Sequence, residues 1–295
     1  MIYTSITVER KENYAIVQLD GGKVNEINTA MVRDLKHVFT ALDQDDSVRG
    51  LILSGRPHGF SAGLDIVNIA MGGKVKAEEF WNYYHEALQA MIRFSKPFVC
   101  AITGYAPAGA TILALCADYR VMGKGTKHVV GMHEFKLSMQ VPELLSDIYA
   151  YHLGEKQAWE AVQQMKLYTS DQALEVGLVN ESVEVESVLE RSELYLQKML
   201  NIHTPVFTET KRLLRKNLLN LVDRDFTQLV KDVIYAFGLV NPQGEQFNLV
   251  TGDTPELFVG TKSLEGIATH MITIPDDSMY TLNLVLTGEG FSNYD

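Results

Sequence analysis

Short apolar runs alternate with amphipathic segments along the first part of the chain. Apolar residues over 6–8 and 15–19 flank a charged turn, which predicts a β-hairpin. Apolar positions spaced three and four residues apart then predict a helix that Asn28 or Thr29 can cap. A continuous apolar run at 50–53 is typical of a strand buried on both faces.

The same alternation continues to about residue 122. Glycine-bearing loops at 55–65 and 104–108 separate strands from helices. Strand–helix–strand order of this kind indicates parallel strands joined by crossover helices, and therefore an α/β protein. The expected elements are a helix at 77–94, a strand at 97–102, a helix at 108–117 and a strand at 119–122.

Helices dominate after about residue 142. We expect Pro142 to open a helix that Gly154 ends, and Ser170 to cap a short helix that stops at Gly177. A brief return to strand follows at residues 178–179. Further helices are expected at 155–165, 204–220 and 223–239, and further strands at 271–275 and 279–286.

The composition is that of an ordinary folded protein and narrows the classes of function. Of the 295 residues, 46% are hydrophobic and 21% are charged, which fits neither a disordered chain nor a membrane protein. The formal net charge of -11 argues against a nucleic-acid partner, which would require a basic face. No apolar run approaches the length of a membrane helix, and residues 1–5 lack a signal core. We therefore expect no membrane attachment and a cytoplasmic location.

Three short loops carry the residues that could do chemistry. Residues 58–65 and 104–111 are rich in small residues, so a ligand could approach their backbone N–H groups closely. Residues 129–134 end an apolar run with an acid, Glu134. Each loop alone also has a structural explanation: a turn, close helix packing, or a solvated acid at a strand end. It is the combination that argues for a site.

Together these loops resemble the crotonase (enoyl-CoA hydratase/isomerase) superfamily, from about residue 6 to about residue 245. The resemblance implies a spiral core of repeated ββα units at 1–200 and a C-terminal helical trimerisation region at 201–250. The extension at 251–295 lies beyond the usual end of the family. The resemblance is carried by Phe60-Ser61-Ala62-Gly63-Leu64-Asp65, Lys96-Pro97 with Gly104-Tyr105-Ala106-Pro107-Ala108-Gly109, Cys116-Ala117-Asp118-Tyr119-Arg120, and Gly131-Met132-His133-Glu134.

The resemblance also implies how the site would work. In this family two backbone N–H groups hold the thioester oxygen of an acyl-CoA, and by position they fall here on Ala62 and Gly109. Such an oxyanion hole stabilises the enolate that forms when a proton leaves the neighbouring carbon. No metal or redox cofactor is implied, because CoA enters as part of the substrate. The residues expected to contact that substrate are Ser61, Gly63, Leu64, Asp65, Ile112 and His133.

The acids at the site distinguish between reactions. Hydratases of the family use two glutamates, and the first of these positions holds Ile112, which can neither transfer a proton nor orient water. The second position holds Glu134. One carboxylate is enough to move a proton between two carbons, so the chain looks similar to the Δ3,Δ2-enoyl-CoA isomerase subgroup. His133, next to Glu134, either hydrogen-bonds the carboxylate or faces solvent.

Two alternatives stay open. The chain could catalyse another reaction of the superfamily, such as hydration, decarboxylation or hydrolysis of an acyl thioester. It could also be a non-catalytic acyl-CoA-binding subunit, an alternative that the unusual extension at 251–295 supports. Because family members assemble as trimers or dimers of trimers, we expect one of these assemblies here.

Overall fold

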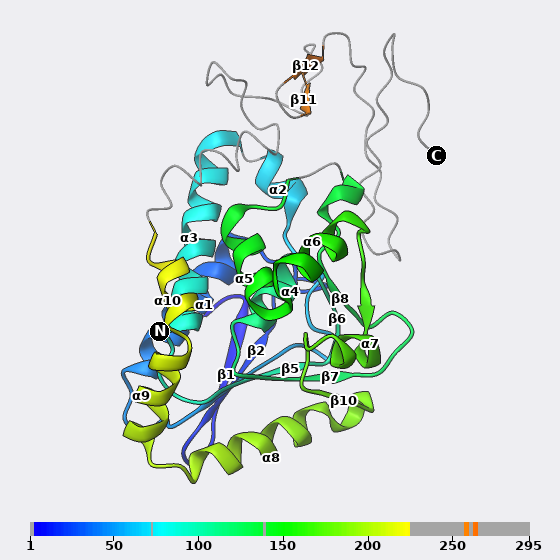
Figure 1. Cartoon of the computed structure of the whole chain (residues 1–295). Coiled ribbons are helices and arrows are strands. Elements are labelled where there is room, and N and C mark those ends of the chain that lie inside the picture. The colour runs from blue at the N-terminus through cyan, green and yellow to red at the C-terminus, as the bar shows by residue number, and fades with distance from the viewer. Residues whose placement is uncertain (1–2, 72, 138–139, 225–256, 260–261, 265–295) are drawn as a thin grey trace.

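The computed structural model describes residues 3–71, 73–137, 140–224, 257–259 and 262–264 (Figure 1). The strands are β1 (Ile6–Arg10), β2 (Ala15–Leu19), β3 (Leu51–Ser54), β4 (His58–Gly59), β5 (Phe98–Ile102), β6 (Gly104–Pro107), β7 (Tyr119–Gly123), β8 (Val129–Gly131), β9 (Tyr168–Thr169), β10 (Glu181–Val183), β11 (Leu257–Val259) and β12 (Lys262–Leu264). The helices are α1 (Thr29–Asp43), α2 (Ile66–Met71), α3 (Gly73–Arg93), α4 (Gly109–Leu115), α5 (Glu143–Leu153), α6 (Glu155–Gln163), α7 (Ser170–Glu175), α8 (Val188–Leu200), α9 (Thr204–Leu214) and α10 (Lys216–Val222), with 3-10 turns at η1 (Glu134–Leu137) and η2 (Val185–Ser187).

Two sheets share the strands of the core. The larger sheet has the order β1-β2-β3-β5-β7-β10, and it is parallel except for the β1–β2 hairpin. The smaller sheet has the order β4-β6-β8-β9, with β4, β6 and β8 parallel. Each successive pair (β3 with β4, β5 with β6, β7 with β8) therefore gives one strand to each sheet. A helix follows the first two of these pairs, and η1 follows the third. The α/β class and the spiral of ββα units are thus confirmed.

The larger sheet has a separate apolar cluster on each face. On one face α1 and α3 pack together, and Phe39, Phe94 and Phe98 form a ring cluster with centroids 4.9–6.3 Å apart. On the other face α8 runs along β3, β5 and β7, as Figure 1 shows. There Leu196 and Leu200 pack over the outward side chains of the strands. The sheet is therefore covered on both faces, which explains why its strands are nearly continuous apolar runs.

A partly buried acid, Asp118, fastens the C-terminal helices to the core. Asp118 accepts hydrogen bonds from the backbone N–H of Phe98 at 2.9 Å, from Lys211 Nζ at 2.7 Å and from Arg215 at 2.7 Å. Arg215 also donates to the Cys116 carbonyl at 2.9 Å. The Lys211 and Arg215 side chains are only 8% and 12% exposed, so both cations depend on this one carboxylate.

Several predicted boundaries were wrong, and tertiary contacts explain them. The turn expected at 104–108 is strand β6, which pairs with β4 on one side and β8 on the other. The single helix expected at 204–220 is two helices, because the chain leaves helical geometry at Arg215, whose side chain turns inward. Thr169 rather than Ser170 caps α7, through a capping box with Gln172. Helix α8 was not foreseen.

The apolar pair Leu178 and Val179 is not a strand. The N–H groups of both residues donate to the Ala173 carbonyl, at 2.8 and 3.2 Å, just after Gly177 with its positive φ of 82°. The pair is therefore buried as the closing contact of a helix end, and strand pairing begins only at β10.

Some predictions lie outside the described residues. These are most of the helix expected at 223–239 and the strands expected at 271–275 and 279–286. Of the extension at 251–295, the structure describes only the antiparallel pair β11–β12. In the described ranges no helix is both long enough and apolar enough to cross a lipid bilayer.

We predict that Asp118→Asn lowers the free energy of unfolding by about 3–5 kcal/mol, because two nearly buried cations lose their counter-charge. The measurement is chemical denaturation at neutral pH. Glu209→Gln serves as the control, since it breaks an exposed pair with Arg212 that is expected to contribute less than about 1 kcal/mol. Equal effects of the two substitutions would contradict the role assigned to Asp118.

Candidate active site

The three loops singled out from the sequence emerge at one edge of the smaller sheet. Strands β4, β6 and β8 are neighbours and run parallel, so the segments that follow them leave from the same end. In register, Gly59 lies opposite Tyr105 and Pro107 lies opposite Gly131. The fold therefore brings together the loop after β4, the turn from β6 into α4 and the segment from β8 into η1.

In the first loop, hydrogen bonds within the protein already use most of the backbone donors. The N–H of Ser61 donates to the Tyr105 carbonyl at 3.1 Å, and that of Ala62 to the Val24 carbonyl at 3.0 Å. Gly63 donates to the Ser61 hydroxyl at 3.1 Å, and Asp65 donates to Ile27 at 3.1 Å.

Within residues 61–65, Leu64 is the residue whose N–H makes no hydrogen bond to any part of the chain that the structure describes. The prediction that Ala62 supplies a free donor therefore conflicts with the structure, because its N–H is already occupied by Val24. The free donor lies two residues further along. Leu64 is thus the better candidate for holding a ligand oxygen from this loop.

The second loop supplies Gly109, the first residue of α4. An N–H in the first turn of a helix has no partner within that helix, and the Gly109 N–H has none among the described residues. A Cβ at Gly109 would lie 2.6 Å from Leu64 Cδ2, so the two loops are in contact here. The Gly109 carbonyl accepts a hydrogen bond from the buried Tyr84 hydroxyl at 3.1 Å. The sequence pattern had identified Gly109 but not Tyr84 as part of the site.

The third segment places Glu134 at the start of η1, and this carboxyl is 8% exposed. Its Oε2 is buried and has no hydrogen-bond partner in the described part of the chain. Burial raises the pKa of Glu134 from 4.5 to about 7, while the backbone N–H groups of Glu134 and His133 oppose the rise. A carboxyl with a pKa near neutrality can both accept and return a proton at physiological pH.

Glu134 forms no ion pair with any residue that the structure describes. Ile112 on α4 is fully buried. Tyr149 on α5 is buried as well, and its hydroxyl lacks a hydrogen-bond partner among the described residues. Burial is the main reason that the pKa of Tyr149 is raised, and the charge of Glu134 adds to the effect. His133 is half-buried, its Nδ1 bonds to no described group, and burial lowers its pKa.

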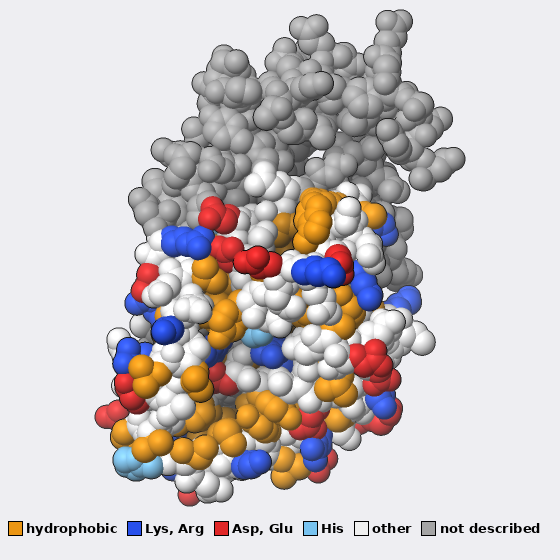
Figure 2. Space-filling model, viewed as in Figure 1, with side chains coloured by type: hydrophobic (Ala, Val, Ile, Leu, Met, Phe, Trp, Pro, Cys, Tyr) orange, Lys and Arg blue, Asp and Glu red, His pale blue; other side chains and the backbone are white. Residues whose placement is uncertain are grey.

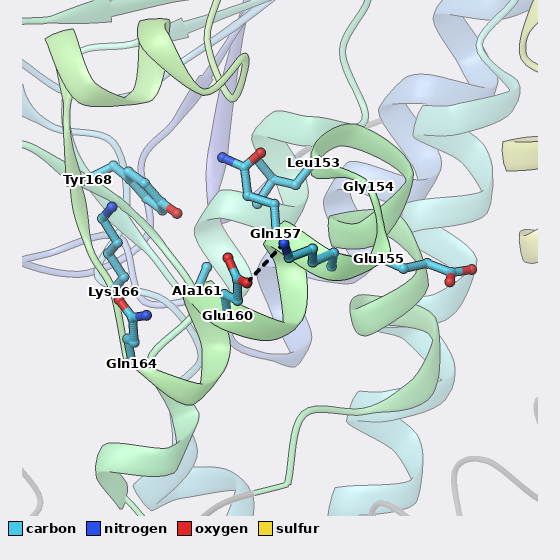
Figure 3. A pocket seen from close by; sticks show the side chains of 10 residues that line it. Leu153, Gly154, Glu155, Gln157, Glu160, Ala161, Gln164, Lys166 and Tyr168 are labelled. Carbon is cyan, nitrogen blue, oxygen red and sulfur yellow. Dashed lines mark ion pairs between the residues drawn. The ribbon is translucent and has the colours of Figure 1, made fainter.

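Asp65 lines a cavity of about 430 Å3 beside the first loop, together with Asn28, Lys76 and Glu79. A larger cavity of about 630 Å3 lies between α6 and β9 (Figure 3). There Lys156 and Glu160 face each other across 3.8 Å, and Lys166 lies over the Tyr168 ring at 4.6 Å. Its lining includes none of the predicted site residues, so size alone does not locate the chemistry.

Comparison with known proteins identifies the group to which this arrangement belongs. The sequence profile described as enoyl-CoA hydratase/isomerase matches residues 9–235. The chain belongs to the enoyl-CoA hydratase/isomerase family. The mitochondrial enoyl-CoA delta isomerase 1 of Mus musculus is 31% identical over 212 residues, which cover 72% of this chain and 73% of the mouse protein.

More distant relatives include a second activity. The crotonyl-CoA hydratase of Syntrophomonas wolfei is 27% identical over 64% of this chain and 73% of its own length. The crystal structure of human mitochondrial delta3-delta2-enoyl-CoA isomerase superimposes with a TM-score of 0.75 at 26% identity. It covers 79% of this chain and 92% of the human one, so the crotonase fold of the described core is shown. Within the family, both isomerases and hydratases are thus related to this chain.

The fold brings the three loops of the predicted site to one sheet edge, and that these residues form the active site remains a prediction. Hydrogen bonding connects Ser61, Gly63 and Asp65 to the scaffold, which makes them supports for the Leu64 loop. Asp65 also accepts a hydrogen bond from Asn68 at 2.7 Å. Tyr149 was missed because a tyrosine in an apolar helix looks like ordinary core, and its orphaned hydroxyl is visible only in three dimensions.

We predict that the stability of the protein changes with pH through Glu134. Since its folded pKa of about 7 lies above the usual 4.5, Glu134 favours folding below pH 4.5 and this contribution is lost as pH rises through 7. Glu134→Gln should therefore match the unaltered protein near pH 4.5 and exceed its free energy of unfolding by about 3 kcal/mol at pH 8. Denaturation at both pH values measures this, with Glu175→Gln on exposed α7 as the control. A stability difference that does not depend on pH would contradict the prediction.

Proposed function

We propose that this protein is an acyl-CoA isomerase that moves the double bond of a 3-enoyl-CoA to the 2-position. The observation that carries the proposal is Glu134, a buried carboxyl with a pKa of about 7, in a chain where Ile112 replaces the family's other acid. The mouse and human relatives named as delta isomerases support the same reaction.

In this mechanism Glu134 removes a proton from C2 of the bound thioester. The electron pair of the C–H bond moves into the thioester carbonyl and forms a dienolate. Its oxygen would be held by the N–H groups of Leu64 and Gly109, and each such donor contributes about 3–4 kcal/mol in comparable sites. The protonated Glu134 then returns the same proton to C4. The carbonyl re-forms, and the double bond lies between C2 and C3.

The second candidate function is hydration of a 2-enoyl-CoA, which the relationship to a crotonyl-CoA hydratase favours. Hydration needs a water molecule to be held and deprotonated while a proton is delivered to the substrate. In family hydratases two acids share this work. The fully buried, apolar Ile112 leaves Glu134 to do it alone, so isomerisation is the better match.

The expected assembly as a trimer or dimer of trimers remains a prediction. Figure 2 shows hydrophobic side chains gathered at the lower end of the molecule, over α8 and α9. Leu194, Val206 and Leu214 are 53%, 58% and 77% exposed there. Such a surface would suit contacts between copies of the chain. The cytoplasmic location also remains a prediction, and the relatives at 29–31% identity are named as mitochondrial.

We predict that the unaltered protein converts 3-hexenoyl-CoA to its conjugated isomer and that Glu134→Gln lowers kcat at least about 1,000-fold, since the amide cannot carry the proton. Conjugated-thioester absorbance follows the reaction. The rate of the unaltered protein should rise with pH through about 7, as Glu134 loses its proton. Full turnover by Glu134→Gln would overturn the proposal, and the Glu175→Gln control should behave like the unaltered protein.

We predict that the same preparation hydrates crotonyl-CoA at a negligible rate, at least about 100-fold below its isomerase rate, because Ile112 cannot handle water. Loss of the enoyl absorbance measures hydration directly. Rapid hydration would favour the second candidate function and show that one carboxyl suffices for it.

A further inference from the structure

The turn between β6 and α4 holds a residue in a strained conformation. Ala108 has φ 52° and ψ −125°, a region that favours glycine because a Cβ is crowded there. A non-glycine residue in such a region costs about 1–3 kcal/mol and persists only when its surroundings enforce it. Gly109, whose N–H is the second donor of the proposed oxyanion hole, is the next residue. The strained Ala108 backbone therefore sets the direction in which the Gly109 N–H points.

A closed set of hydrogen bonds enforces the turn. The Ala108 N–H donates to the Gly131 carbonyl at 2.8 Å. The Thr111 hydroxyl donates to the Ala106 carbonyl at 2.6 Å and accepts from the Gly131 N–H at 2.8 Å. Both backbone groups of Gly131 are thereby tied to the turn, one directly and one through Thr111.

The hydroxyl of Thr111 is the only side-chain link in this set, and it is deeply buried. Thr111 is 1% exposed, and Ala106 and Gly131 are buried as well. No solvent can replace the hydroxyl if it is removed, so the Gly131 N–H and the Ala106 carbonyl, which also face each other in the β6–β8 ladder, would each lose one hydrogen bond. Gly131 has a φ of 136°, and a Cβ there would lie 2.5 Å from the Lys166 carbonyl oxygen. The Gly131 backbone therefore lies close against Lys166, which limits movement toward that side.

The set joins the two halves of the site. On one side it ends at Ala108, immediately before the Gly109 donor. On the other side it ends at Gly131, three residues before Glu134. We propose that Thr111 is a positioning residue, whose hydroxyl holds the strained Ala108 turn against Gly131 and so sets the Gly109 N–H relative to Glu134. This inference rests on the proposed function of the site.

The proposal requires a group that both donates and accepts a strong hydrogen bond. Valine has the shape of threonine without the hydroxyl, whereas serine keeps the hydroxyl without the methyl group. Thr111→Val should lower kcat for 3-hexenoyl-CoA by about 10- to 100-fold with KM changed less than about 3-fold, because donor and base are misaligned. Thr111→Ser should retain most of the activity. Ser192→Ala on α8 is the control, since it removes another fully buried hydroxyl that bonds a backbone carbonyl, that of Val188.

A direct measure of the oxyanion hole separates this inference from the proposed reaction. The probe is 4-(dimethylamino)cinnamoyl-CoA, whose absorbance moves to longer wavelength when donors polarise its thioester carbonyl. We expect the full shift when the probe is bound to the unaltered protein, Thr111→Ser or Ser192→Ala. When it is bound to Thr111→Val, we expect at most half of that shift. A full shift with Thr111→Val would overturn the inference and leave the proposed function standing. Absence of the shift in the unaltered protein would instead contradict the oxyanion hole and the proposed function.

A second substitution tests the strain itself and covers the case in which Thr111→Val folds poorly. Glycine adopts the conformation of Ala108 without strain, so a turn containing it needs less support. Ala108→Gly combined with Thr111→Val should have a kcat at least about 3-fold above that of Thr111→Val alone, and it should regain part of the lost absorbance shift. Thermal unfolding shows whether the double variant is folded. If it is folded but recovers neither kcat nor the absorbance shift, Thr111 does not act through the Ala108 turn and the inference is wrong.

Discussion

The parallel pairing of β4, β6 and β8 is the constraint on which the site depends. These strands are short, but each is followed by one segment of the candidate site, and the three segments leave the sheet at the same edge. Residues far apart in sequence are brought into contact in this way, so that Gly109 has no room for a side chain next to Leu64. The larger sheet and its helices serve mainly to hold these three strands in register. The three loops of the candidate site therefore meet at one sheet edge.

The partly buried Asp118 and the buried Glu134 show how the fold treats charge in opposite ways. Asp118 is surrounded by a backbone N–H and two cations, and it joins the C-terminal helices to the core. Glu134 has an oxygen with no described partner, and its pKa is raised by burial. The first environment favours the ionised carboxylate, whereas the second favours the protonated carboxyl and lowers stability once Glu134 ionises.

The sequence predicts the order of elements, the spiral of ββα units and the three loops, because apolar periodicity and glycine-rich turns are local signals. It predicts that Glu134 and Gly109 belong to one site, and the fold brings the segments that carry them to the same sheet edge. It does not predict which N–H of the first loop is free, because the Ala62 donor is used by Val24, a residue 38 positions earlier. Likewise, Arg215 divides a continuous helical pattern by turning toward Cys116 and Asp118. These errors come from long-range hydrogen bonds that override local preference.

Helix α4 connects the site to the rest of the core, and it is held at both ends. At its start, Ala108 and Thr111 bond to Gly131. At its end, Arg215 donates to the Cys116 carbonyl, and a ring nitrogen of His152 lies 2.8 Å from the carbonyl oxygen of Leu115. A seven-residue helix held in this way cannot relax the turn before it by shifting along its axis. The hydrogen bonds at the far end of α4, including that of the Asp118-bound Arg215, resist the same displacement and so add to those of Thr111 and Gly131. In this respect the C-terminal helices, although not part of the site, help to hold the Gly109 donor in place.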